Sequence, residues 1–105
     1  ELAMEGRFTY EKVVEKMTHD PADLFRIDRR GYIRPGYYAD LVLIDPQATW
    51  TVAPENILYK CGWSPFEGYT FHHAVWKTFV NGLLAYSEGQ VNETVRGQEV
   101  RYLSE

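Results

Sequence analysis

The sequence predicts an α+β fold in which helices come first and short antiparallel strands follow. Three observations carry this prediction. Apolar side chains recur at helical spacing over residues 9–27, residues 41–44 read Leu-Val-Leu-Ile without a polar break, and Asn81-Gly82 separates two runs typical of a β-hairpin. With 105 residues and a formal net charge of −4, the chain has the size of one small domain and shows no basic footprint for nucleic acid.

The first quarter of the chain is predicted to form two helices. Thr9 suits the N-cap of the first helix, whose apolar face comprises Tyr10, Val13, Val14 and Met17. Asp20 suits the N-cap of the second helix, because Pro21 fits the first helical position. The apolar side of this second helix comprises Leu24, Phe25 and Ile27.

From Gly31 onward the pattern changes to strands. Tyr32-Ile33 reads as a short strand, and Arg34-Pro35-Gly36 fits a type II turn because Gly permits the positive φ that this turn needs. Residues 41–44 lack polar alternation, which predicts a strand covered on both faces. The remaining elements are a short strand at 50–52, one or two helical turns within 54–60, a loop at 61–68, a hairpin of 74–80 and 83–87, a turn at 88–89, and a final strand near 100–102.

The candidate metal ligands are His19, His72 and His73, and we expect none of them to bind a metal ion. His72 and His73 are adjacent, so in a strand they point to opposite faces. The sequence has neither an HxH nor an HExxH motif. Cys61 has no His nearby in sequence, so we expect a half-buried, inert thiol and not a nucleophile. The residues themselves predict no catalytic, metal-binding or substrate-binding site.

Asp40 and Asp45 bracket the aliphatic run and are the carboxylates that an acid–base pair could use. Their separation of five positions places the two side chains on opposite faces of a regular strand, which argues against such a pair. We expect Asp40 to accept backbone N–H groups from a neighbouring turn instead. The residues therefore describe a packed structural segment.

Residues 19–46, HDPADLFRIDRRGYIRPGYYADLVLIDP, resemble the closing segment of the metal-dependent amidohydrolase superfamily. The matching features are Pro21-Ala22, Gly31-Tyr32-Ile33, Gly36, Ala39-Asp40, the aliphatic run at 41–44 and Asp45. The run Phe-Val-Asn-Gly at 79–82, followed by Leu-Leu-Ala-Tyr-Ser-Glu-Gly, resembles the final hairpin of that superfamily. The loop Trp-Ser-Pro-Phe-Glu-Gly at 63–68 and the tail at 91–103 are similar to those of the dihydroorotases, close to the allantoinases.

This resemblance implies a zinc hydrolase that interconverts carbamoyl aspartate and dihydroorotate in pyrimidine synthesis. Its zinc ligands, catalytic base and substrate-binding residues would all lie upstream of Glu1, so none is assigned to a residue of this chain. The alternatives are the same portion of an allantoinase or a dihydropyrimidinase-like protein, or a non-catalytic dihydroorotase-like scaffold. The resemblance also implies a cytoplasmic protein with a small-molecule substrate and no nucleic-acid or membrane partner, and it leaves homo-oligomerisation open.

The resemblance divides the chain into two parts. Residues 1–30 would be the last helices of a (β/α)8 barrel, and residues 31–105 would be the C-terminal part of a small β-sandwich with a loop at 61–70. The segment alone is expected to be inactive and to bind no zinc, and its helix faces should lose their cover in isolation. Trp63 and Phe66 would plug the seam between barrel and sandwich, the alternative being a loop that reaches the barrel mouth or a subunit contact.

Overall fold

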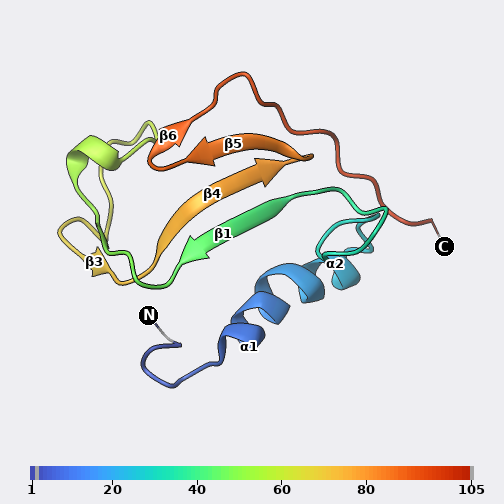
Figure 1. Ribbon diagram of the computed structural model, residues 1–105, viewed down its shortest axis with the longest axis horizontal. Coiled ribbons are helices and arrows are strands. Elements are labelled where there is room, and N and C mark those ends of the chain that lie inside the picture. The colour runs from blue at the N-terminus through green and yellow to red at the C-terminus, as the bar shows by residue number, and fades with distance from the viewer. Residues whose placement is uncertain (2, 105) are drawn as a thin grey trace.

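The structure is a computed structural model that describes residue 1 and residues 3–104. Its extents are 46 × 37 × 24 Å, so the molecule is flat and elongated. A helical segment runs along one side of a four-stranded sheet, and a long loop with a two-stranded ribbon lies at one end (Figure 1). The helices-then-strands order predicted for the α+β fold is confirmed.

One continuous helical segment replaces the two predicted helices. It consists of α1 (Tyr10–Val14), the π turn η1 (Glu15–His19) and α2 (Asp20–Leu24). Thr9 is the N-cap as predicted, because its hydroxyl accepts a hydrogen bond from the Lys12 amide at 3.1 Å. The prediction that Asp20 is the N-cap of a separate second helix is wrong, because its own backbone is helical, with φ −58° and ψ −45°.

The π turn lies just before Pro21, and we attribute it to that residue. A proline inside a helix lacks the N–H donor, and its ring crowds the preceding turn. The wider turn closes with a hydrogen bond from the Asp20 amide to the Glu15 carbonyl, and the Thr18 hydroxyl donates to the Val14 carbonyl at 2.7 Å. The helix therefore passes through the proline without a break, and the Asp20 carboxylate instead accepts from Lys16 Nζ at 2.6 Å.

The connection from the helix to the sheet is irregular. The strand predicted at Tyr32-Ile33 does not form. The positive φ values of Arg29 (52°) and Gly31 (80°) coil the backbone here, so a strand cannot start. The turn predicted at Arg34-Pro35-Gly36 is confirmed: the Tyr37 amide donates to the Arg34 carbonyl at 3.1 Å, and φ of Gly36 is 82°.

The main sheet is antiparallel, with strand order β1-β4-β5-β6. Its strands are β1 (Leu41–Asp45), β4 (Ala74–Val80), β5 (Leu83–Ser87) and β6 (Gln90–Val91). Both predicted two-residue turns are present, with φ of 51° and 79° at Asn81-Gly82 and of 49° and 88° at Glu88-Gly89. These left-handed conformations suit the tight hairpin turns that match the twist of antiparallel strands.

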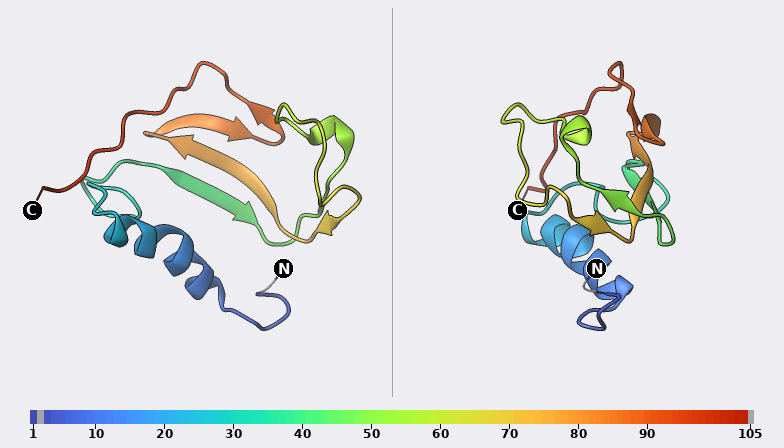
Figure 2. Two further views of the ribbon diagram at one scale, coloured as in Figure 1. Left: turned by 180° about the vertical axis from the view of Figure 1, so that it is seen from behind. Right: turned by 90° about the vertical axis from the view of Figure 1, so that its left-hand side faces the viewer.

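A second, smaller ribbon pairs β2 (Trp50–Thr51) with β3 (Thr70–Phe71). The short helix η2 (Pro54–Asn56) and the loop at 61–68 lie between these strands, as predicted. Val52 ties the loop to the ribbon, because its amide donates to the Tyr69 carbonyl at 2.9 Å and its carbonyl accepts from the Gly68 amide at 2.8 Å. Seen from the side, this end projects away from the main sheet (Figure 2).

The C-terminal tail returns along the edge of the molecule to the end of α2 (Figure 1). The strand predicted near residues 100–102 is wrong, since a single antiparallel bridge joins Ile27 to Tyr102. Two backbone hydrogen bonds support it, from the Asp28 amide to the Arg101 carbonyl and from the Leu103 amide to the Arg26 carbonyl, each 2.8 Å. The partner backbone takes positive φ at Arg26 (54°), so the pairing does not extend into a ladder.

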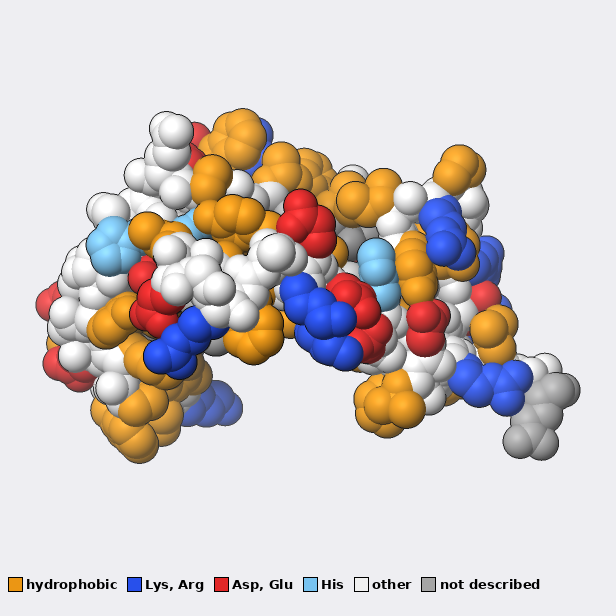
Figure 3. Space-filling view, turned by 90° about the horizontal axis from the view of Figure 1, so that it is seen from below, with side chains coloured by type: hydrophobic (Ala, Val, Ile, Leu, Met, Phe, Trp, Pro, Cys, Tyr) orange, Lys and Arg blue, Asp and Glu red, His pale blue; other side chains and the backbone are white. Residues whose placement is uncertain are grey.

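The chain buries few apolar side chains by itself. Among the described residues, the buried hydrophobic ones are Ala22 and Val52. On β1, Val42 is 57% exposed and Ile44 is 59% exposed, so the double cover predicted for this strand is not supplied by the described residues. The helix side chains are also bare, as expected, with Met17 at 74% exposed. Hydrophobic side chains accordingly reach the surface over several parts of the molecule (Figure 3). No described helix is long and apolar enough to cross a membrane.

Candidate functional site

The three histidines lie in three different environments. His72 Nδ1 is 3.2 Å from the Glu1 carboxylate, and His73 Nε2 is 2.8 Å from the Tyr10 hydroxyl. His19 stacks face to face on a tyrosine ring of the loop that follows the helix. Within residues 1 and 3–104, no group of three or more His, Cys, Asp or Glu side chains could hold a metal ion. These side chains therefore form no ligand set of the kind that zinc requires.

Cys61 is exposed, so the prediction of a half-buried thiol is wrong. The loop that carries it projects from the ribbon, and little covers the side chain there. Its Sγ lies 3.6 Å from the Trp63 carbonyl oxygen, the distance of a weak sulfur hydrogen bond within the loop.

Asp40 behaves as the sequence predicts. Its Oδ1 accepts the backbone N–H of Asn81, in the neighbouring hairpin turn, at 2.8 Å. Its Oδ2 pairs with the Arg30 guanidinium. Asp45 lies at the other end of β1 and accepts the Gln47 amide at 2.8 Å. The two carboxylates thus cap separate turns and do not form an acid–base pair.

Arg30, Asp40 and Asn81 together form a cluster that we call the polar joint. Arg30 Nη2 donates to Asn81 Oδ1 at 3.2 Å, and the Arg30 guanidinium carbon lies 4.2 Å from the centre of the Tyr38 ring. The Arg30 side chain is 12% exposed. The polar joint links the end of the helical region, the start of β1 and the β4–β5 turn. The sequence predicted the carboxylate but not its cation, because nothing local marks Arg30 as a partner of residues 10 and 51 positions away.

The chemistry of the polar joint is structural. The Asp40 carboxylate is held by a cation and a backbone N–H, so both of its oxygens already have partners within the joint. Among the described residues, two buried atoms of the joint lack a hydrogen-bond partner, Arg30 Nε and Asn81 Nδ2. The joint therefore fixes one arrangement of three chain segments while leaving some of its polar groups unsatisfied.

A second cluster fastens the loop to the helix. The Tyr32 hydroxyl donates to Asp23 Oδ2 at 2.6 Å, and this hydrogen bond raises the pKa of Tyr32 above its ordinary value. The ring stacks on His19 with centroids 4.1 Å apart, and the Arg34 guanidinium carbon is 4.1 Å from the ring centre. The Tyr32 ring thus packs against both the His19 ring and the Arg34 guanidinium, and its hydroxyl is engaged by Asp23. These contacts give Tyr32 a structural role.

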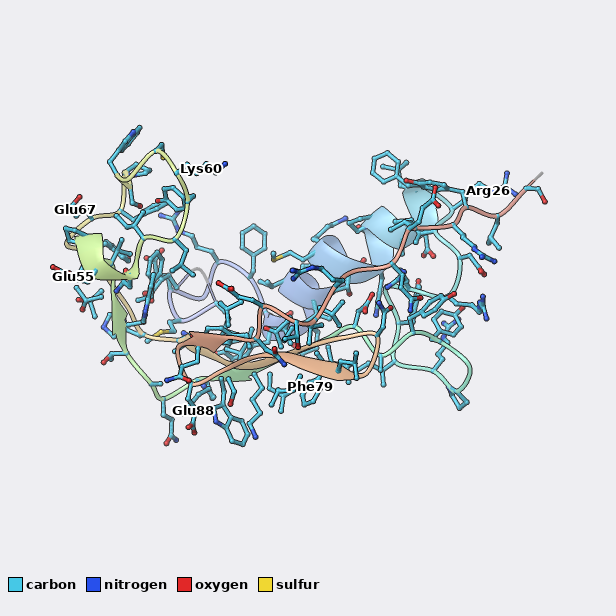
Figure 4. All side chains as sticks on the ribbon, turned by 90° about the horizontal axis from the view of Figure 1, so that it is seen from above. Arg26, Glu55, Lys60, Glu67, Phe79 and Glu88 are labelled. Carbon is cyan, nitrogen blue, oxygen red and sulfur yellow. The ribbon has the colours of Figure 1, made fainter. Side chains whose placement is uncertain are left out.

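The loop end of the molecule carries an aromatic cluster. Phe66, Tyr69 and Phe71 pack edge to face, with ring centroids 4.7–6.4 Å apart, and Trp50 stacks on Phe71. Trp63 is 60% exposed. The same end bears Glu55, Lys60 and Glu67, at the opposite end of the molecule from Arg26 (Figure 4). Phe66 therefore has packing partners inside the loop, whereas Trp63 presents most of its ring to solvent.

Two shallow hollows on the described surface are open to solvent. One lies along β5 and β6, between Tyr86 and Asn92, and the other lies beside α2, between Lys16 and Phe25. A small-molecule site normally encloses most of its ligand. Neither of these two hollows includes a residue of the polar joint.

Comparison with known proteins connects this architecture to one family. The model of the amidohydrolase family matches residues 1–85. A dihydroorotase of Geobacter metallireducens is 41% identical over 81% of this chain and 20% of its own length. Dihydroorotases of Clostridium acetobutylicum (37% identical, 83% of this chain, 20% of the relative) and Pyrococcus furiosus (30%, 90% and 23%) are also similar. The chain thus spans about a fifth of the length of these relatives.

Solved structures agree with the sequence comparison. The L-hydantoinase (dihydropyrimidinase) from Arthrobacter aurescens superposes with a TM-score of 0.79 at 31% identity, over 91% of this chain and 22% of that protein. A D-hydantoinase superposes with a TM-score of 0.78 at 26% identity, over 86% of this chain and 20% of that protein. The family model covers most of the chain, and the fold is shared with two hydantoinases. The chain therefore belongs to the amidohydrolase family.

Proposed function

We propose that this segment is the C-terminal structural portion of a dihydroorotase, the zinc hydrolase that interconverts N-carbamoyl-L-aspartate and dihydroorotate in pyrimidine biosynthesis. The observation that carries the proposal is the similarity to dihydroorotases of bacteria and archaea, at 30–41% identity over 81–94% of the chain. The proposal includes a cytoplasmic location, which a single cysteine fits. The full-length protein is then a hydrolase of a cyclic amide C–N bond.

We assign none of the reacting groups to this segment. Its histidines lie apart, and the described residues form no group that suits a metal ion. The Asp40 carboxylate is engaged by Arg30 and a backbone amide. Zinc in such an enzyme lowers the pKa of a bound water and so supplies a nucleophile at neutral pH. The donors that would hold this zinc are proposed to lie in the barrel, outside residues 1–105.

We propose a division of the chain into a barrel part and a sandwich part, and exposed apolar side chains on both parts support it. Residues 1–30 would contribute the last helices of the barrel, and residues 31–105 would contribute the C-terminal part of the β-sandwich. Support comes from Met17 and Leu24 on the helical segment and from Val42 and Ile44 on β1, all more than half exposed. Surfaces of this kind mark interfaces. We propose that the rest of the polypeptide covers them in the full-length enzyme.

The test is a substrate comparison with the full-length protein. Purified enzyme should form dihydroorotate from N-carbamoyl-L-aspartate and run the reverse reaction. Turnover of hydantoins or dihydropyrimidines in place of dihydroorotate would replace the proposal with the second candidate, a hydantoinase-type enzyme. The similarity to solved hydantoinase structures favours that candidate. A full-length protein that turns over none of these compounds would be a non-catalytic homologue.

The role of the 61–70 loop is a separate part of the proposal. We propose that Phe66 and Trp63 plug the seam between barrel and sandwich, with Phe66 held by its aromatic neighbours and Trp63 facing the barrel. Trp63→Ala and Phe66→Ala in the full enzyme should lower the free energy of unfolding and leave KM unchanged. Lys60→Ala, on the same loop, is the control that should change neither. A raised KM without a loss of stability would instead place the loop at the substrate.

A further inference from the structure

The β4–β5 turn contains a chemically labile pair, Asn81-Gly82. In such a pair the Gly nitrogen can attack the Asn side chain, because Gly has no side chain to hinder the approach. Gly82 N forms a bond to Asn81 Cγ and loses its proton, and the Cγ–Nδ2 bond breaks with release of ammonia. Water then opens the resulting cyclic imide at either carbonyl and gives aspartate or isoaspartate. The net reaction consumes one water and releases one ammonia.

The fold restrains each atom that this reaction uses. The nucleophile is engaged, because the Gly82 N–H donates to the Ala39 carbonyl at 2.9 Å. The electrophile is held, because Asn81 Oδ1 accepts from Arg30 Nη2 at 3.2 Å. The leaving group Nδ2 is buried away from solvent, so water has poor access to protonate it. Two segments distant in sequence, at residues 30 and 39, therefore control the reactivity of the turn.

We propose that Asn81 is a deamidation site whose reaction the polar joint suppresses. Asn81 deamidates only when the hydrogen bonds that hold its side chain and the Gly82 amide open. Either deamidation product at position 81 would disrupt the polar joint. An aspartate at position 81 places a second carboxylate beside Asp40, where one Arg30 must serve both. An isoaspartate adds a main-chain carbon to a two-residue turn, whose length sets the register of β4 against β5.

The polar joint has two opposing effects on the deamidation rate of Asn81, and the larger of the two decides whether the native state reacts faster or slower than the unfolded chain. The Arg30 guanidinium polarises the Asn81 carbonyl, which by itself would assist attack. The attack nevertheless needs the Gly82 nitrogen free and the side chain turned toward it, so both hydrogen bonds must open first. Two hydrogen bonds of ordinary net strength reduce the open fraction by about thirtyfold. Suppression therefore prevails over activation, and the native rate should be about thirtyfold below the unfolded rate.

The experiment follows conversion of Asn81 in the full-length protein by peptide mapping and mass spectrometry at mildly alkaline pH. Samples are kept native or unfolded in guanidinium chloride, and Asn92 serves as an internal reference. Conversion of Asn81 should be about thirtyfold slower in the native sample. Asp40→Asn, which weakens the hold on Arg30, should accelerate native conversion, whereas Asp45→Asn should not. Equal rates in the native and unfolded samples, or a folded Asp40→Asn variant that reacts like wild type, would overturn the proposal.

A measurement on the wild-type protein covers the case in which Asp40→Asn does not fold. Hydrogen exchange of the Gly82 amide reports the opening of its bond to Ala39. Small additions of guanidinium should raise this exchange rate and the Asn81 conversion rate in parallel. Conversion that stays constant while Gly82 exchange increases would show that opening does not control the reaction, and the proposal would fail.

Discussion

Removing the carboxylate of the polar joint should destabilise the protein far more than removing its counterpart at the other end of β1. Asp40→Ala deletes the anion beside Arg30 and the acceptor of the Asn81 N–H. The Arg30 side chain is 12% exposed, so it keeps a charge that water solvates poorly, whereas Asp40 is 35% exposed. Breaking a buried pair costs about 3–5 kcal/mol, and a surface pair contributes about 0–1 kcal/mol.

The Asp40–Arg30 pair lies between these limits, which suggests about 2 kcal/mol for the ion pair and about 1 kcal/mol for the backbone hydrogen bond. Asp40→Ala should therefore lower the free energy of unfolding by about 3 kcal/mol. Asp45→Ala is the matched control, because it loses a single hydrogen bond from Gln47 and should cost about 1 kcal/mol or less. Denaturant unfolding of the intact polypeptide measures both. Equal losses in the two variants would refute the reasoning about the joint.

Two further predictions concern the loop between the helix and the sheet. Gly31→Ala should lower the free energy of unfolding by roughly 3 kcal/mol, because a Cβ at φ +80° collides with Ala22. Gly36→Ala, at φ +82° but with open space around the Cβ, should lower it by about 1 kcal/mol. Equal losses of the two variants in unfolding experiments would contradict this reasoning. The phenol of Tyr32 should ionise above its ordinary pKa of 10.0 because it donates to Asp23, so its contribution to stability is present below that pH and is lost as the pH rises through the folded pKa. Ultraviolet titration should show this shift, and Asp23→Asn should remove it; an unchanged titration would count against the hydrogen bond.

The features that sequence predicted correctly are those set by local chemistry. The Asn81-Gly82 and Glu88-Gly89 turns require positive φ, and residues 74–80 are rich in β-branched and aromatic side chains, so β4 and β5 were predicted with their observed bounds. The Pro35-Gly36 turn and the Thr9 cap follow from the same kind of rule. In each case a few adjacent residues contain all the information.

The features that sequence missed depend on residues far apart. Pro21 reads locally as a helix start, but the preceding π turn lets the helix continue. Tyr32 reads as a strand residue, but the positive φ of neighbouring residues and the stack on His19 hold it in a coiled loop. Tyr102 pairs with Ile27, whose neighbouring backbone is irregular, so a single bridge forms in place of a strand. Arg30 was not predicted to join Asp40, because the fold alone brings them together.

The central claim is that residues 1–105 support a hydrolase whose reacting groups lie elsewhere in the polypeptide. The most direct test measures metal content and turnover of N-carbamoyl-L-aspartate for the full-length protein and for the 105-residue segment side by side. The full-length protein should contain zinc and turn over substrate, and the segment should show neither stoichiometric zinc nor activity. Zinc binding with turnover by the segment alone would contradict the account.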